Sequence, residues 1–261
     1  MIELKTESEL EILRENCQIL ATILRELTRR AKAGISTRQL NDWAEELMRE
    51  FKAESAFKGY QGHGPYPFPA SICTSINHEI VHGIPSATRI LKAGDVLSID
   101  VGIKRNGFYA DLATTITIGG ADGHVGTRHA VPLLNVAKEA LRRGIAAAHP
   151  QHRVSDISHA IGAYVESMGF SVVKRFVGHG VGRQMHEDPQ IPNHGSPGRG
   201  ALLKPGMVLA IEPMVKQDQE EEVVSEDGWT VVTPNGGLAA HFEAMVAVTE
   251  RGPEILANGA I

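Results

Sequence analysis

The sequence contains little of what marks secreted and membrane proteins. Only two cysteines occur among 261 residues, Cys17 and Cys73, which excludes a framework of several disulfides and favours a reducing compartment. No run reaches the about 18 consecutive apolar residues of a membrane span. The charged stretch 1–16 lacks the apolar core of a signal peptide. We therefore expect a cytoplasmic protein that has no membrane partner.

The chain also lacks a large excess of either sign of charge. The chain carries 26 Lys and Arg against 31 Asp and Glu, for a formal net charge of -5, and no basic stripe stands out. This balance argues against a nucleic acid as the main ligand. Because the chain has 261 residues, 42% of them hydrophobic, it can bury one substantial core. We expect a single domain over residues 1–261 that acts as a monomer.

The sequence does contain a segment that predicts a β-hairpin, SIDVGIKRNGFYAD at Ser98–Asp111. Its central Asn-Gly pair, residues 106–107, is a strong turn signal because both positions need a positive φ. With this turn, Asp100 lies opposite Ala113, and Asp111 points to the same sheet face as Asp100. Two carboxylates so placed repel each other unless they are solvated, protonated or bridged by a cation. The hairpin alone leaves open a polar, solvent-facing surface and a cation site.

The chain also resembles itself. LKAGDVLSID, residues 91–100, and LKPGMVLAIE, residues 203–212, share the pattern L-K-x-G-x-V-L-x-I-acid. Each reads as a tight turn that leads into a buried strand ending in a carboxylate. We therefore predict two duplicated αβ halves, about 1–120 and 125–255, that are related by a pseudo-two-fold axis and whose sheets join.

Further elements accompany each copy of this repeat. HGIP, residues 82–85, is echoed by HEDP, residues 186–189. Two stretches with apolar residues at helical spacing precede each copy. Ser8 and Glu11 form a capping-box pattern near the start of the first stretch. The predicted helical stretches are 7–34, 36–51, 130–148 and 155–170.

The repeat predicts that four acidic residues lie close together. Symmetry-related strands would bring Asp100, Asp111, Glu212 and Glu243 together between the halves. Four carboxylates in a core cannot all ionise without partners, and divalent cations are the natural compensation. His179, which has no equivalent in the first half, lies between two glycines that allow sharp turns. A single histidine can be structural or a metal ligand, and the acids favour the ligand.

The order of these motifs resembles one enzyme family. D-(x10)-D, G-H-G-x-G-x-x-x-H-E-x-P, I-E-P-M and H-F-E-A follow one another as in the type I methionine aminopeptidases, in the short bacterial form. The resemblance implies an α+β pita-bread fold of pseudo-two-fold duplicated αβ halves, with an antiparallel-rich sheet covered by helices. It also implies two divalent ions of Co, Mn, Fe or Zn, held by Asp100, Asp111, His179, Glu212 and Glu243. Asp111 and Glu243 would bridge the two ions.

The resemblance further implies a reaction and a substrate. The enzymes remove the N-terminal methionine of nascent proteins and peptides when the second residue is small, by metal-activated attack of water on the first peptide bond. Glu212 would shuttle the proton, and His82 and His186 would contact the scissile amide. Association with ribosomes is a further expectation. The methionine side chain would be bound by Tyr60, Phe68, Cys73 and Trp229.

The sequence departs from the family in places that concern this pocket. Phe57 stands where a cysteine is common, Met185 stands where an aromatic residue is often found, and the loop Gln61–Ser71 is longer than usual. His241, which alternates onto the same strand face as Glu243, is a candidate neighbour of the metal ligands. We expect the remaining histidines at the surface: His63, His78, His124, His129, His149, His152, His159 and His194.

Two other functions stay open at this stage. Prolidases and other Xaa-Pro peptidases share the metal ligands and the fold, but they normally carry a large N-terminal domain that this chain lacks. A non-catalytic pita-bread binding module needs none of the five ligands, all of which are present here. Peptide cleavage and metal analysis separate these possibilities.

Overall fold

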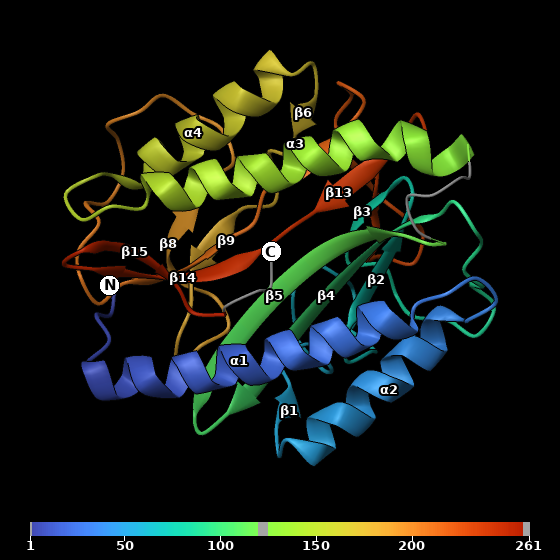
Figure 1. The fold of residues 1–261 in the computed structure, drawn as a ribbon, viewed down its shortest axis with the longest axis horizontal. Coiled ribbons are helices and arrows are strands. Elements are labelled where there is room, and N and C mark those ends of the chain that lie inside the picture. The colour runs from blue at the N-terminus through green and yellow to red at the C-terminus, as the bar shows by residue number, and fades with distance from the viewer. Residues whose placement is uncertain (1, 120–124, 258–261) are drawn as a thin grey trace.

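The structure is a computed structural model that describes residues 2–119 and 125–257 (Figure 1). The helices are α1 Glu7–Arg30, α2 Thr37–Glu50, α3 Val125–Ala147 and α4 Val154–Ser167. The strands of the first half are β1 Glu54–Ser55, β2 Cys73–Ile76, β3 Glu79–Val81, β4 Val96–Arg105 and β5 Phe108–Thr117. The later strands are β6 Ser171–Val172, β7 Gly178–Gly180, β8 Glu187–Ile191, β9 Val208–Ile211, β10 Met214–Lys216, β11 Val223–Val224, β12 Val231–Val232, β13 Ala239–His241, β14 Ala244–Thr249 and β15 Gly252–Ile255.

The four predicted helical stretches all form helices, but the capping box of α1 differs from the prediction. The Thr6 hydroxyl accepts a hydrogen bond from Glu9 N, and the Glu9 carboxylate accepts one from Thr6 N. This reciprocal pair is a capping box. The capping box predicted at Ser8 and Glu11 is therefore wrong by two residues.

The predicted hairpin is confirmed with its register. Asn106 (φ 52°) and Gly107 (φ 81°) form the turn between β4 and β5, both with the positive φ that such a turn requires. Asp100 pairs with Ala113, and Asp111 pairs with Gly102 two positions along the ladder. The two aspartates therefore lie on one face of the sheet.

Antiparallel ladders join most strands within each half, while β3 of the first half pairs with β12 of the second. In the first half, β4 lies between β1 and β2 and also pairs with β5. In the second half, the order is β15-β14-β9-β7-β8. There His179 of β7 pairs with Ala210 of β9, while Ala244 of β14 pairs with Ile211 of β9. These registers bring the ends of three strands to one place.

A short hydrogen-bonded seam joins the halves. Glu243 N donates to Ala113 O at 2.9 Å. Thr115 Oγ1 donates to His241 O at 2.7 Å and accepts from His241 N at 2.9 Å. Ser98 Oγ lies 2.8 Å from Thr115 Oγ1 and completes this buried contact. The acids of the second half are thereby fixed against the hairpin that carries the acids of the first.

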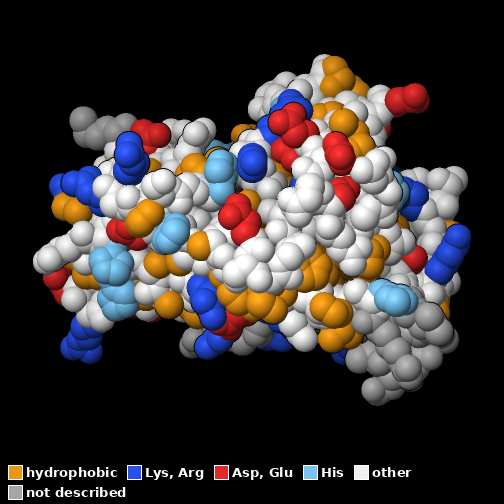
Figure 2. Space-filling model, turned by 90° about the horizontal axis from the view of Figure 1, so that it is seen from above, with side chains coloured by type: hydrophobic (Ala, Val, Ile, Leu, Met, Phe, Trp, Pro, Cys, Tyr) orange, Lys and Arg blue, Asp and Glu red, His pale blue; other side chains and the backbone are white. Residues whose placement is uncertain are grey.

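Two apolar cores support this seam. One packs α1 and α2 against β4 and β5, and the other packs α3 and α4 against β9 and β14. Figure 1 shows the strands between the two pairs of helices. The face in Figure 2 has Lys and Arg side chains interspersed with Asp and Glu. Within the described ranges, no helix is both long and apolar enough to cross a membrane.

Candidate metal centre and catalytic site

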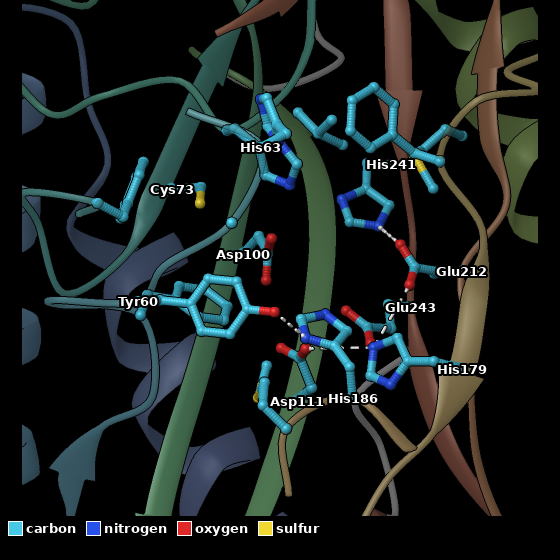
Figure 3. A pocket seen from close by; sticks show the side chains of 18 of the residues that line it. Tyr60, His63, Cys73, Asp100, Asp111, His179, His186, Glu212, His241 and Glu243 are labelled. Carbon is cyan, nitrogen blue, oxygen red and sulfur yellow. Dashed lines mark hydrogen bonds and ion pairs between the residues drawn. The ribbon is translucent and has the colours of Figure 1, made fainter. Parts of the chain in front are cut away.

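The acids converge on a cavity of about 230 Å³ between the two halves (Figure 3). A cavity of this size can admit a side chain together with solvent. Its walls include all eleven residues predicted as site residues: Tyr60, Phe68, Cys73, His82, Asp100, Asp111, His179, His186, Glu212, Trp229 and Glu243.

Adjacent strands position the four carboxylates. Asp100 and Asp111 project from the paired strands β4 and β5, while Glu212 directly follows β9 and Glu243 directly precedes β14. Asp100, Asp111 and Glu243 are 9%, 5% and 2% exposed. The acids therefore come from both halves and meet where water has little access.

Burial and mutual repulsion alter the titration of these acids. Burial raises the pKa of Asp100 to about 7, with Glu212 adding to the rise. Burial and the neighbouring carboxylates raise the pKa of Asp111 and of Glu243 well above their usual range. Asp100 Oδ1, Asp111 Oδ1 and Glu243 Oε1 are buried with no hydrogen-bond partner among the described residues. Such groups demand protonation or a cation.

His179 completes a set of donors that fits a divalent ion. Its Nδ1 lies 2.8 Å from Gly180 O, to which it donates, so Nε2 is left as the ligand atom. Nε2 lies 3.6 Å from Glu212 Oε1 and 4.0 Å from Asp111 Oδ2 (Figure 3). One ligand atom each from Asp111, His179 and Glu243 lie within 4.8 Å of one another. Carboxylates with one imidazole suit Mn, Fe, Co and Zn.

The glycines beside His179 have a steric role. A Cβ at position 178 would lie 2.5 Å from Ala210 O, and one at position 180 would lie 2.1 Å from Asp188 O. β7 can therefore lie between β8 and β9 only with glycine on both sides of the histidine.

Two further imidazoles line the cavity. His82 has φ 60°, a left-handed conformation that is uncommon outside glycine and that clusters at functional sites. Desolvation lowers the pKa of His82 to about 3, and desolvation together with His179 lowers the pKa of His186 to about 4. Both rings are thus neutral near pH 7, when each has one N–H to donate. The His179 and His186 ring centroids are 4.3 Å apart.

The four predicted pocket residues lie together on an apolar wall. Phe68, Cys73 and Trp229 are buried, and Tyr60 packs against them. The Phe68 and Trp229 ring centroids are 5.2 Å apart. Phe57 and Met185, which depart from the family pattern, also line the cavity. The departures therefore concern this wall directly.

His63 lines the cavity, although the sequence did not lead us to expect it there. It is exposed, as expected, yet its ring lies 5.0 Å from that of His82 and 4.8 Å from that of Trp229. The signal was present, because Gly62-His63-Gly64 repeats the Gly-His-Gly pattern of His179. A Cβ at position 64 would lie 2.3 Å from the Trp229 indole, so the loop can lie flat against this ring only with glycine there.

The other histidines mostly follow expectation. His241 is buried, and its Nε2 lies 3.4 Å from Glu212 Oε2, so it does contact a candidate ligand. His194 is half-buried rather than exposed, and His124 lies outside the described residues. The histidines found exposed as expected are His78, His129, His149, His152 and His159.

Comparisons with known proteins agree with this site. Residues 11–250 match the model of metallopeptidase family M24. The chain is 46% identical over 256 residues to methionine aminopeptidase of Clostridium acetobutylicum, covering 98% of each chain. Its fold matches the crystal structure of methionine aminopeptidase from Thermotoga maritima with a TM-score of 0.90 and 42% identity, over 98% of this chain and 99% of the other.

A more distant likeness concerns the fold alone. The prolidase from Pyrococcus furiosus aligns with a TM-score of 0.74 and 24% identity. The alignment covers 98% of this chain but 65% of the prolidase.

Proposed function

The chain belongs to metallopeptidase family M24, as a type I methionine aminopeptidase, and on this premise we propose that it excises methionine from nascent proteins and peptides whose second residue is small. The resemblance identified in the sequence is confirmed, and so is the pita-bread fold that it implied. The chain is a hydrolase that uses divalent metal and acts on peptides.

One observation carries the proposed mechanism: buried carboxylates from both halves meet His179 beside an apolar wall. We assign Asp100, Asp111, His179, Glu212 and Glu243 as the residues that would hold the two divalent ions. Bound divalent ions would supply Lewis acidity and a water of lowered pKa. These donors suit Co, Mn, Fe and Zn alike, so the supply of each metal in the cell also decides which one binds.

The chain's own side chains supply the remaining chemistry. Glu212, at the edge of the acidic cluster with 14% of its side chain exposed, takes the proton of the attacking water and passes it to the leaving amine. His82 and His186, both neutral, donate N–H groups to the scissile amide and to its tetrahedral intermediate. These assignments rest on their positions in the cavity wall.

The apolar wall would hold the methionine side chain. Tyr60, Phe68 and Trp229 present aromatic surface, with which a thioether makes favourable contacts, and Cys73 lies opposite Asp100 in the β2–β4 ladder. The methionine would therefore lie against this wall with its scissile amide next to the acids.

A peptide assay tests this function. Protein stripped by a chelator and then supplied separately with Mn, Fe, Co or Zn should release methionine from Met-Ala-Ser and leave Met-Leu-Ser largely uncleaved. An Xaa-Pro peptide serves as the control substrate and should not be cleaved. Absence of methionine release with all of these ions would refute the proposal.

The two alternatives receive less support. The likeness to prolidase is at the level of the fold, and this chain spans only 65% of that protein. A binding module requires no metal, whereas here buried carboxylate oxygens lack partners in the described ranges. Metal analysis of the purified protein distinguishes the binding module from the peptidase, because a binding module would contain no stoichiometric metal.

We further propose that the protein is a cytoplasmic monomer that meets its substrates at the ribosome. The support is the nascent-chain substrate and the absence of a membrane-spanning helix among the described residues. Light scattering after gel filtration tests the monomer, and co-sedimentation with ribosomes at several salt concentrations tests the association.

A further inference from the structure

Tyr60 makes a hydrogen bond that a pocket wall does not need. Its hydroxyl oxygen lies 2.7 Å from Nδ1 of His186, and the two ring centroids are 5.2 Å apart (Figure 3). The partners are 126 residues apart in sequence and come from opposite halves of the molecule. Figure 3 shows the His186 ring between this hydroxyl and the acidic cluster.

The chemistry of imidazole gives this contact a consequence. In a neutral ring, one nitrogen carries the proton and the other accepts a hydrogen bond. When Nδ1 accepts from the phenol, the proton is on Nε2, at the other side of the ring. We propose that Tyr60 is a positioning residue, which holds His186 in the Nε2–H tautomer so that this N–H donates to the substrate carbonyl.

Both partners are held firmly enough for such a role. Tyr60 N donates to Phe57 O at 2.9 Å, and Tyr60 O accepts from Phe68 N at 2.9 Å, so the backbone around the phenol is fixed on both sides. Burial raises the pKa of Tyr60, which keeps the hydroxyl protonated and able to donate.

His186 is fixed by its neighbour. It directly precedes β8, whose first residue, Glu187, forms a salt bridge of 2.6 Å with the buried Lys5. Glu187 also accepts a hydrogen bond from Gln184 N, which closes the turn that carries His186. The backbone that carries the His186 ring is therefore held in place beside the phenol.

This inference rests on the proposed role of His186 and adds to it. A tyrosine that serves only as a wall needs its ring, whereas a positioning residue needs its hydroxyl. Tyr60→Phe separates the two because it removes the hydroxyl and keeps the ring. Tyr164→Phe is a matched control, since Tyr164 lies on α4, where its ring packs against Arg143.

Kinetics give the first test. Tyr60→Phe should lower kcat about 10-fold with KM unchanged, as for other residues that orient a functional imidazole. His186→Ala should cost about 10²–10³ in kcat, as for loss of one oxyanion donor. Adding Tyr60→Phe to His186→Ala should cost nothing more, because the hydroxyl then has no ring to orient. A Tyr60→Phe enzyme with normal kcat, or a full additional loss in the double variant, would overturn the proposal.

Nitrogen NMR gives a second test that is independent of activity. In metal-free protein labelled with ¹⁵N-histidine, the His186 signals are identified by their absence in His186→Ala. The wild type should show a protonated Nε2 and an unprotonated Nδ1, and Tyr60→Phe should show a mixture of the two tautomers. A protonated Nδ1 in the wild type would refute the inference. If the wild type released no methionine, the proposed function would be refuted. The NMR measurement would still show which nitrogen of His186 carries the proton.

Discussion

Glu212 lies between two imidazoles. His241 Nε2 is 3.4 Å from its Oε2, and His179 Nε2 is 3.6 Å from its Oε1 (Figure 3). His241 is itself fixed to the first half, because its backbone exchanges two hydrogen bonds with Thr115 Oγ1. The orientation of the proposed proton carrier therefore depends on the seam between the halves.

His241→Ala should weaken catalysis by loosening Glu212. We expect kcat and metal affinity to fall about 10-fold, the lower end of the effect of removing a residue that orients a ligand. His241→Gln, which can still donate to the carboxylate, should recover most of the loss. Steady-state kinetics and isothermal titration with Mn(II) measure both effects. His149→Ala, an exposed histidine, is the control. Unchanged kinetics in His241→Ala would separate this residue from the site.

Glu212→Gln should remove the proton carrier and keep the shape of the side chain. We expect kcat to fall at least about 10²-fold, as for loss of general acid–base catalysis. The thermal unfolding midpoint should change little, because Glu212 is partly exposed and outside the apolar cores. Methionine release and calorimetry measure the two quantities. Substantial activity in Glu212→Gln would assign proton transfer to another group.

Asp100→Asn should affect one metal ion more than the other. By the family resemblance, Asp100 would contribute to one ion only, whereas Asp111 and Glu243 would contribute to both. Titration of stripped protein should show one site near wild-type affinity and one clearly weakened site. Asp218→Asn, a carboxylate that pairs with Lys216 outside the cavity, is the matched control. Two unaltered sites in Asp100→Asn would contradict the assignment.

In metal-free protein, the stability that the buried acids contribute should fall as the pH rises from about 4 to about 7. The folded pKa of Asp100, about 7, lies above its unfolded value, as do those of Asp111 and Glu243. On these three acids the folded state thus holds more protons than the unfolded state in this window, so their contribution to the free energy of unfolding falls with increasing pH, opposite in sign to the contribution of His82 and His186. Unfolding midpoints measured in chelator against pH test the sign.

Two variants of that measurement sharpen it. Asp100→Asn should flatten the pH slope, since the amide does not titrate. Added Mn(II) should reverse the loss near pH 7, because a bound cation stabilises the ionised acids of the folded state. Equal pH slopes in the metal-free wild type and in Asp100→Asn would show that ionisation of Asp100 costs the folded state nothing.

Much of this site could be predicted because its signals are local or repeated in sequence. The register of Asp100 and Asp111 follows from the Asn-Gly turn, whose positive φ angles leave one pairing. The duplicated strand pattern indicated that Glu212 occupies in the second half the position equivalent to that of Asp100 in the first. The glycines around His179 marked a position where backbones approach closely.

Contacts between distant segments decided the rest. Thr6 and Glu9, rather than Ser8 and Glu11, begin α1, because Lys5 N donates to Gly206 O at 2.7 Å and holds the preceding chain extended. Both patterns are equivalent as sequence, so only the tertiary bond selects between them. Residue types and spacing thus determined which groups are the candidates for the chemistry. Folding alone decided that the Tyr60 hydroxyl meets His186, because a hydrogen bond between residues so far apart has no local pattern in the chain.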